Sequence, residues 1–231
     1  MNLLAIDTAG KTAGVAVLQD GALRYAAFCD TGLTHSETLL PMVDTALRQC
    51  HLTVREIDVF GVTAGPGSFT GLRIGLAAVK GLALPQNTPC APVSTLEALA
   101  YGVVGTGTTI GALDARRGQV YWAAFDTLTH ARLTPDEAAP LEALENFIKS
   151  CKKPLLFVGD GAALCYNKFD HVEGVLPCPP ALRGLRGAGV ALAAQACIAR
   201  GETMPPAALR PDYHRLSQAE RERAEREAAA K

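Results

Sequence analysis

A glycine-rich turn is the part of this chain whose residue types most resemble a chemical site. It reads Ala64-Gly65-Pro66-Gly67-Ser68-Phe69-Thr70-Gly71-Leu72-Arg73-Ile74-Gly75. It lies between an apolar run over 57–62, which predicts a buried strand, and an apolar-periodic run over 72–84, which predicts a helix. Such an arrangement can hold a phosphate group, because free backbone N–H groups and the helix dipole converge at the helix N-terminus.

The turn matches none of the standard phosphate or nucleophile motifs. A Walker A loop requires lysine after its last glycine, and Leu72 follows Gly71. A dinucleotide fingerprint requires a third glycine where Thr70 stands. A nucleophile elbow requires glycines where Pro66 and Thr70 flank Ser68. The turn therefore predicts neither a standard phosphate loop nor a catalytic serine.

Three residues at the end of the first apolar segment, Asp7, Thr8 and Lys11, form a weak candidate nucleotide site. In this interpretation the aspartate holds a metal through water and the turn touches phosphate. The alternative is a turn aspartate that accepts hydrogen bonds from local N–H groups. Asp114 has the same two interpretations, and neither aspartate has a nearby carboxylate in the sequence with which to form a metal cluster or an acid–base pair.

The histidines and cysteines form no metal-binding pattern. The five histidines show no H-x-x-x-H pair and no Cys/His ligand spacing, and His35 beside a helix cap is the one that we single out. The seven cysteines include no C-x-x-C pair, which indicates reduced thiols. We therefore predict no metal site, no catalytic residue and a cytoplasmic protein, since no stretch reaches the ~18 apolar residues of a membrane helix.

The composition limits the class of function. The chain has 231 residues, of which 48% are hydrophobic and 19% charged, so it can bury a sizeable core. Its formal net charge of −1 argues against strong binding of RNA or DNA by this chain alone. A nucleic-acid role would need the basic surface of a partner.

The first hundred residues predict a meander followed by alternating helices and strands. The opening apolar segments predict three antiparallel strands over 2–8, 12–19 and 22–29, and a capping box that begins at Thr34 predicts a helix to about residue 50. The elements expected next are a strand over 57–64, a helix over 68–84, a strand over 90–93 and a helix over 94–101.

A glycine-rich stretch over 102–107 predicts a domain boundary, because the pattern starts again after it. The segments around Asp114 and Val120 resemble those around Asp7 and Val15, which indicates a weak internal duplication. The elements expected in the second half are a helix over 138–150, a strand over 154–158, a short helix from 162, a strand over 171–176 and a helix over 188–200. We therefore expect an N-terminal subdomain over 1–103, a C-terminal subdomain over 104–215 and a charged tail over 216–231.

The helix expected over 68–84 carries small residues at helical spacing, Gly71, Gly75 and Ala78. A glycine inside a helix costs about 1 kcal/mol relative to alanine, so the stripe indicates close approach of another backbone. Two interpretations remain: tight packing inside the same domain, and close approach of a partner's helix. We favour the second, with Arg73 and Lys80 at the rim of the interface.

Several strings together resemble the TsaB (YeaZ) family. They are Ile6-Asp7-Thr8, His35 with Leu40-Pro41-Met42-Val43, the turn from Gly65 to Gly75, Ser94-Thr95-Leu96, Asp114 to Trp122, and the C-terminal P-x-Y-x-R string of Pro211, Tyr213 and Arg215. The G-P-G-S-F-T-G-x-R-I-G string is the most specific of them. The resemblance covers about residues 2–215, with a looser match over 127–186.

The resemblance implies an α/β fold of the actin/hexokinase/Hsp70 (ASKHA) type, with two similar halves that each contain a mixed sheet flanked by helices. It implies a role in making threonylcarbamoyladenosine (t6A), the modified adenosine next to the anticodon of tRNAs that read ANN codons. The implied partners are TsaD, which transfers the threonylcarbamoyl group, and the ATPase TsaE. It further implies a homodimer through the same face when TsaD is absent, tRNA contact only through the complex, no membrane, and ATP or ADP only in complex with TsaD.

TsaD, a paralogue of the family, resembles this chain through Thr63-Ala64-Gly65-Pro66-Gly67 and the elements that follow. Where TsaD carries an H-x-x-x-H metal pair, this chain has Thr95 and Leu99, which cannot replace two imidazoles. The resemblance therefore implies a non-catalytic subunit that pairs with TsaD through the helices over 35–50 and 68–84. The expected partner-binding residues are His35, Leu39, Met42, Val43, Thr70, Gly71, Arg73, Ile74, Gly75, Ala78 and Lys80.

Two other classes of function are weighed against this one. An ATP-hydrolysing or metallopeptidase-like ASKHA enzyme would use Asp7 and Thr8 at its ATP site. A Rossmann-like dinucleotide binder fits less well, because the opening strands form an antiparallel meander and Thr70 occupies the last glycine place.

Overall fold

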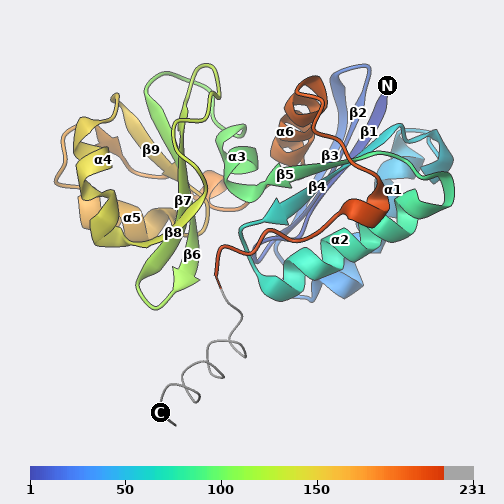
Figure 1. The fold of residues 1–231 in the computed structure, drawn as a ribbon, viewed down its shortest axis with the longest axis horizontal. Helices are drawn as coiled ribbons and strands as arrows, with labels where there is room; N and C mark the ends of the chain where they lie inside the picture. The colour runs from blue at the N-terminus through green and yellow to red at the C-terminus, as the bar shows by residue number, and fades with distance from the viewer. Residues whose placement is uncertain (216–231) are drawn as a thin grey trace, which may run out of the picture.

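Two five-stranded sheets and the helices packed on them make up the chain, in a computed structural model that describes residues 1–215 (Figure 1). The tail expected over 216–231 lies outside the described residues. Among the helices of residues 1–215, none combines the length and the apolar character that crossing a bilayer requires.

The first sheet has the strand order β3-β2-β1-β4-β5. Its strands are β1 Asn2–Asp7, β2 Ala13–Gln19, β3 Ala22–Cys29, β4 Val59–Gly65 and β5 Cys90–Ser94. The first three strands confirm the expected meander, and the turn between β2 and β3 has Asp20 and Gly21 at φ of 51° and 78°, as two-residue hairpin turns require.

Helices cover both faces of the first sheet. On one face lie α1 His35–Gln49 and α2 Phe69–Ala83, whose buried residues share a core with β1, β2 and β4. On the opposite face lies α6 Gly187–Ala199, which packs against β1, β2 and β5 (Figure 1). The expected helices over 35–50 and 68–84 are thus confirmed.

The second sheet has the strand order β10-β9-β6-β7-β8. Its strands are β6 Thr108–Arg116, β7 Gln119–Asp126, β8 Glu137–Pro140, β9 Leu155–Val158 and β10 Val175–Leu176. The helices α4 Glu145–Ser150 and α5 Ala162–Phe169 share a core with one face of this sheet. β6 pairs antiparallel with β7 and parallel with β9, as β1 does with β2 and β4, which supports the expected duplication.

A central core joins the two sheets. It contains residues of α3 Thr95–Ala100 and α6, together with residues from the facing sides of both sheets. The chain after α6 also returns to the first half, since Met204 pairs with Cys90 and Leu209 lies in the core below α1 and α2. Residues 187–209 were expected in the second subdomain, and this part of the expected division is corrected.

Two expected elements have a different structure, and the strand expected over 171–176 is reduced to Val175–Leu176. The helix predicted over 138–150 begins as strand β8 and becomes helical only at Leu141. Pro140 explains the difference, because it cannot donate to a helix and instead ends a strand that pairs with β7 at Gln119. Short 3-10 helices are Val54–Glu56, Leu84–Gln86, Leu141–Leu144, Pro180–Leu182 and Pro206–Ala208.

Candidate functional site

The glycine-rich turn connects β4 to α2, and two of its N–H groups donate hydrogen bonds within the chain. Ser68 N donates to Ala9 O at 2.7 Å, and Ser68 Oγ accepts from Gly71 N at 3.2 Å as the N-cap of α2. A Cβ atom on Gly67 would lie 2.5 Å from Ala9 O. The β1–β2 turn therefore packs directly on the glycine-rich turn, and Gly67, Ser68 and Phe69 line a cavity beside it.

Gly71 and Gly75 face the interior of the first half. A Cβ atom on Gly71 would lie 2.0 Å from Thr8 O, and one on Gly75 would lie 2.4 Å from Thr8 Oγ1. Thr8 Oγ1 donates to Gly71 O at 2.8 Å, so the helix and the end of β1 are in direct contact. Our favoured interpretation, clearance for a partner's helix, is wrong for these two glycines, and tight packing within the domain explains them.

Asp7 and Thr8 are buried beneath the β1–β2 turn. Asp7 Oδ1 accepts from Thr63 Oγ1 at 2.8 Å and from Ala9 N at 3.0 Å, whereas Oδ2 has no partner within residues 1–215. Burial raises the pKa of Asp7 from 3.8 to about 6, and these hydrogen bonds and His35 partly oppose the shift. Asp7 therefore fits the alternative of a turn aspartate that accepts a hydrogen bond from a local N–H group. Its side chain does not reach an open site.

The pKa of Asp7 predicts a pH-dependent stability. Because the folded-state pKa is raised, the folded chain binds more protons than the unfolded chain between about pH 4 and 6, and stability falls as pH rises through this window. A shift of this size corresponds to roughly 3 kcal/mol. Asp7→Asn removes this contribution. Urea unfolding of both chains gives the unfolding free energy of the variant minus that of the original chain, and this difference should increase by roughly 3 kcal/mol from pH 4 to pH 7.5. A difference that stays constant with pH would contradict the assignment.

A cleft lies between the two halves. It consists of adjoining cavities of about 290 and 420 Å³ that share Gly10, Lys11, Leu113 and Asp160 in their linings. Of the three weak nucleotide candidates, only Lys11 lines the cleft.

Asp160 is a cleft residue that the sequence analysis missed. It lies between β9 and α5, and its Oδ1 accepts from Asp114 N at 3.0 Å. Burial raises the pKa of Asp160, the hydrogen bond from Asp114 N opposes the shift, and the charge of Asp114 adds to it. The statement that Asp114 has no nearby carboxylate is thus wrong in three dimensions. A glycine-flanked aspartate between a predicted strand and a predicted helix, Gly159-Asp160-Gly161, is the signal that marks it.

The two residues in place of the TsaD histidine pair are buried. Leu99 is 4% exposed and packs in the central core, and Thr95 is 0% exposed with no partner for its Oγ1 within residues 1–215. In the same part of the chain, no three His, Cys, Asp or Glu side chains are placed to hold a metal ion together. Charged side chains of both signs line the 290 Å³ cavity and offer hydrogen bonds and ion pairs to a polar ligand; they are Lys11, Arg116, Arg215, Asp114 and Asp160.

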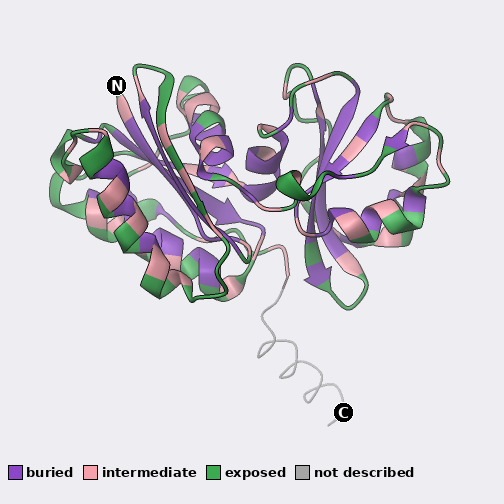
Figure 2. Ribbon diagram, turned by 180° about the vertical axis from the view of Figure 1, so that it is seen from behind, coloured by how far each residue is buried: buried purple, intermediate pink, exposed green. Residues whose placement is uncertain are grey.

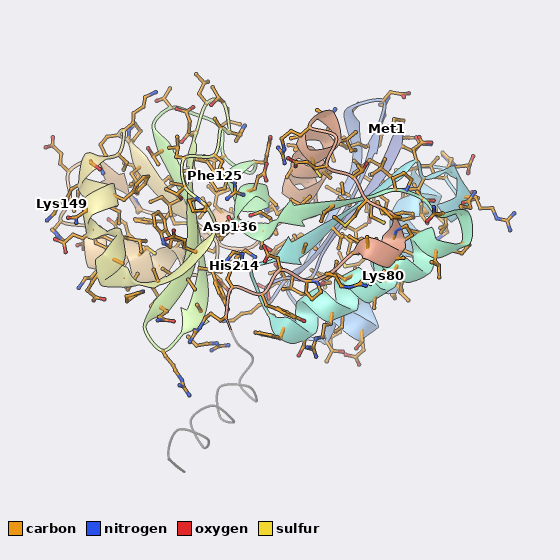
Figure 3. All side chains as sticks on the ribbon, viewed as in Figure 1. Met1, Lys80, Phe125, Asp136, Lys149 and His214 are labelled. Carbon is orange, nitrogen blue, oxygen red and sulfur yellow. The ribbon has the colours of Figure 1, made fainter. Side chains whose placement is uncertain are left out.

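The expected partner-binding residues fall into three groups by exposure. Thr70 and Arg73 are exposed, and the half-buried ones are His35, Met42, Ile74, Ala78 and Lys80, the last of which is labelled on α2 in Figure 3. Leu39 and Val43 are buried in the core beneath α1. They stabilise the monomer, as Gly71 and Gly75 do, and their assignment as contact residues is corrected.

His35 joins the start of α1 to the β1–β2 turn. Its Nε2 lies 2.9 Å from Gly10 O, which is a hydrogen bond within the first half. His35 thereby fixes the position of the first turn of α1 relative to the turn that lines the cleft.

The outward stripe of α2 was only partly identified from the sequence. Its exposed residues, three or four apart, are Thr70, Arg73, Ala77, Gly81 and, just beyond the helix, Leu84. On the neighbouring helix α1, Leu40 is 53% exposed; the two helices are seen at the lower left of Figure 2. The stripe on α2 carries one charged residue, whereas the outer face of a surface helix is usually charged and polar. Ala77 and Gly81 follow the same helical spacing as Gly71 and Gly75 but lie on a different side of the helix, and this spacing is the signal that could have marked them.

The chain is similar in sequence to a known protein family and to several of its members. The family model for TsaD, tRNA N6-adenosine threonylcarbamoyltransferase, matches residues 30–222. The chain is 32% identical over 177 residues to the tRNA threonylcarbamoyladenosine biosynthesis protein TsaB of Bacillus subtilis, covering 75% of this chain and 77% of that protein. It is 40% identical over 128 residues to TsaB of Escherichia coli, covering 54% of this chain and 55% of that protein.

Solved structures agree with the fold. A Pseudomonas aeruginosa protein described as similar to peptidase YeaZ superimposes with a TM-score of 0.76 at 27% identity, over 93% of this chain and 99% of that chain. Component A of (R)-2-hydroxyglutaryl-CoA dehydratase from Acidaminococcus fermentans shares the fold at a TM-score of 0.51 and 12% identity, over 86% of this chain and 99% of that chain. The expected ASKHA fold of two similar halves is confirmed. The chain belongs to the TsaB (YeaZ) family.

Proposed function

We propose that this chain is a subunit of the t6A modification machinery that binds and activates TsaD without transferring the threonylcarbamoyl group itself. The names of the relatives in Bacillus subtilis and Escherichia coli support the pathway. The match to the TsaD family model shows that this chain itself resembles TsaD, and pairing of the two related chains is part of the proposal. In this proposal TsaE joins the same complex, tRNA is contacted only through it, and ATP or ADP binds only when TsaD is present.

The outer surface of α1 and α2 is the proposed site of TsaD binding. We call it the docking face and define it by Leu40 of α1 and by Thr70, Arg73, Ala77, Gly81 and Leu84 of the α2 stripe. The observation that carries the proposal is that the α2 stripe is largely uncharged, and that Leu40 of α1 and Leu84 after α2 are 53% and 61% exposed. Apolar residues grouped on an exposed surface mark a protein interaction site.

Small residues on the docking face leave space for a partner's backbone. A Cβ atom built on Gly81 would meet no atom within 4 Å, in contrast to the clashes at Gly71 and Gly75. We therefore propose that Ala77 and Gly81, and not Gly71 and Gly75, give a partner's helix room to approach α2 closely. The exposed leucines supply apolar area that association removes from water.

The same face would close a homodimer when TsaD is absent. Two copies cannot pair through the docking face while TsaD occupies it, so we propose that homodimer and heterodimer exclude each other. A substitution on this face therefore affects both assemblies.

Reconstitution of t6A formation tests the proposed function. Threonylcarbamoyl-AMP and tRNA are incubated with TsaD and TsaE, with and without this chain, and t6A is measured by mass spectrometry of the digested tRNA. We expect product only when the chain is added to TsaD and TsaE, and none from the chain alone. Equal product without the chain would contradict the proposal. Hydrolysis of ATP or of a peptide by the chain alone, lost in Asp160→Asn, would favour the alternative of an ASKHA enzyme.

A further inference from the structure

The C-terminal segment Pro211–Arg215, which we call the clasp, crosses from the first half of the molecule to the second. Figure 1 shows the chain passing in front of α2 toward β6, and Figure 3 labels His214 between the halves. Pro211, Tyr213 and Arg215 form the C-terminal P-x-Y-x-R string that resembles the TsaB family, and the sequence predicts no role for it.

The clasp is seated directly on the end of β4. Asp212 N donates to Ala64 O at 2.8 Å. A Cβ atom on Gly65 would lie 2.1 Å from Asp212 O, so β4 and the clasp are in backbone contact. His214 Nε2 lies 3.0 Å from Asp212 Oδ2, which links two side chains within the clasp.

Tyr213 joins the clasp to the first turn of α2. Its ring stacks on that of Phe69, with centroids 4.3 Å apart and an angle of 15° between the planes. Its hydroxyl accepts a hydrogen bond from Arg73 Nε at 2.8 Å, and the Arg73 guanidinium lies 5.7 Å from the ring centroid. Arg73 belongs to the docking face, and Tyr213 is 37% exposed beside it. Tyrosine and arginine are enriched among the residues that dominate protein interfaces.

Arg215 fastens the other end of the clasp to the second half. Its guanidinium donates to the carbonyl oxygens of Ala115 and Arg116 at the β6–β7 turn. Arg116 has a φ of 67°, which places this turn in a defined left-handed conformation. Arg215 also lines the 290 Å³ cavity of the cleft, so it lies where the two halves face each other.

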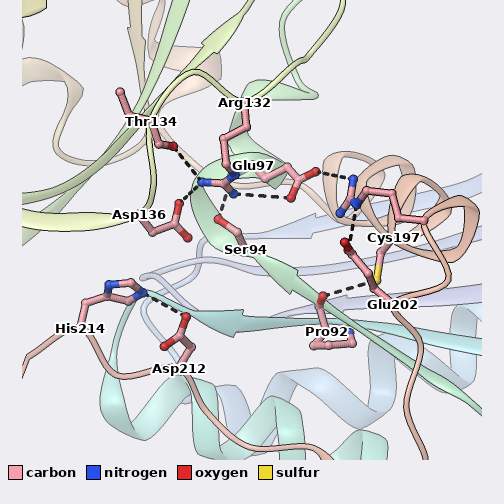
Figure 4. A network of polar contacts seen from close by, with 11 residues as sticks. Pro92, Ser94, Glu97, Arg132, Thr134, Asp136, Cys197, Glu202, Asp212 and His214 are labelled. Carbon is pink, nitrogen blue, oxygen red and sulfur yellow. Dashed lines mark hydrogen bonds and ion pairs between the residues drawn. The ribbon is translucent and has the colours of Figure 1, made fainter.

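A second set of contacts ties the halves together without touching α2. Glu97 of α3 pairs with Arg200, which follows α6, and with Arg132 from the segment between β7 and β8 (Figure 4). This ionic network contains no residue of the docking face. The clasp differs because its Tyr213 contacts Arg73 of the docking face and its Arg215 contacts the carbonyl oxygen of Arg116.

Resting on the proposed function, we propose that TsaD bound to the docking face also contacts Tyr213, and that the clasp transmits this binding to the β6–β7 turn at the edge of the cleft. A partner that immobilises Phe69, Arg73 and Tyr213 holds the clasp in place, and the clasp in turn holds Arg215 against the turn. Binding at one face thereby orders the cleft edge in the other half. Binding of TsaD and ordering of the cleft edge are therefore coupled, because each makes the free energy of the other more favourable.

Hydrogen–deuterium exchange with mass spectrometry tests the clasp on the full chain, alone and saturated with TsaD. We expect peptides that cover 114–119 to exchange at least about fivefold more slowly in the complex, a typical size for coupling between sites. In Arg215→Ala the chain still binds TsaD, because Arg215 lies outside the docking face, but this slowing is lost. Arg210→Ala is the matched control, since Arg210 donates only to the carbonyls of Ala207 and Leu209 among the bonds that residues 1–215 show. It should retain the slowing.

The outcomes separate the two proposals. Calorimetry on the same samples shows whether TsaD binds at all, and absence of binding by the original chain removes both the proposed function and the clasp. Binding without slowed exchange at 114–119 overturns the clasp alone. Slowing that persists in full in Arg215→Ala also overturns it.

Discussion

Replacement of Gly71 by alanine is expected to lower the unfolding free energy by about 2 kcal/mol, because so close a contact places the cost of overpacking at the upper end of its usual range of about 1–3 kcal/mol. The added Cβ would lie 2.0 Å from the backbone oxygen of Thr8, which cannot rotate away as a side chain would. Thr8 is itself held, since its hydroxyl donates to Gly71 O. The gain in helix propensity, about 1 kcal/mol, offsets only part of this cost.

Gly81→Ala is the matched control, because the same substitution in the same helix meets open space at Gly81. It should raise the unfolding free energy by about 0.5–1 kcal/mol. Thermal unfolding followed by circular dichroism should therefore show a lower midpoint for Gly71→Ala and a higher one for Gly81→Ala, by about 2–4 °C for each kcal/mol. Equal midpoints for the two variants would show that Gly71 does not pack on Thr8.

Ala77→Arg is expected to weaken binding of TsaD by more than about 100-fold, which corresponds to about 2.7 kcal/mol. Ala77 is exposed at the middle of the docking face, so the variant should fold normally. A long charged side chain there separates the two surfaces and must lose its hydration if they remain in contact. The homodimer should be weakened in the same variant, as sedimentation velocity would show, because it would use the same face.

Much of the first half could be predicted because its signals are local. The Asp20-Gly21 turn and the capping box at Thr34 each determine a boundary from neighbouring residues, and the structure has them where expected. The segment over 138–150 shows the limit of such signals. Its apolar residues fit a helix, but pairing with β7 makes its first part a strand, and no local feature except Pro140 indicates this.

The direction in which a helical stripe faces could not be predicted from spacing. Helical periodicity shows that Gly71 and Gly75 share one side of α2, but only the folded chain shows that this side meets Thr8. The same limit explains the buried Leu39 and the missed Ala77. Asp114 and Asp160 are 46 residues apart in the sequence, so their contact depends on the β6–β9 pairing, which no local pattern reveals.

Isothermal titration calorimetry of TsaD into three forms of the chain tests the central claim, that the docking face binds TsaD. The forms are the original chain, Ala77→Arg and Leu164→Glu, the last of which alters an exposed leucine on α5 in the second half and serves as a control. The account predicts equal affinity for the original chain and Leu164→Glu, and a loss of more than about 100-fold for Ala77→Arg. An Ala77→Arg variant that is folded and binds TsaD as tightly as the original chain would contradict it.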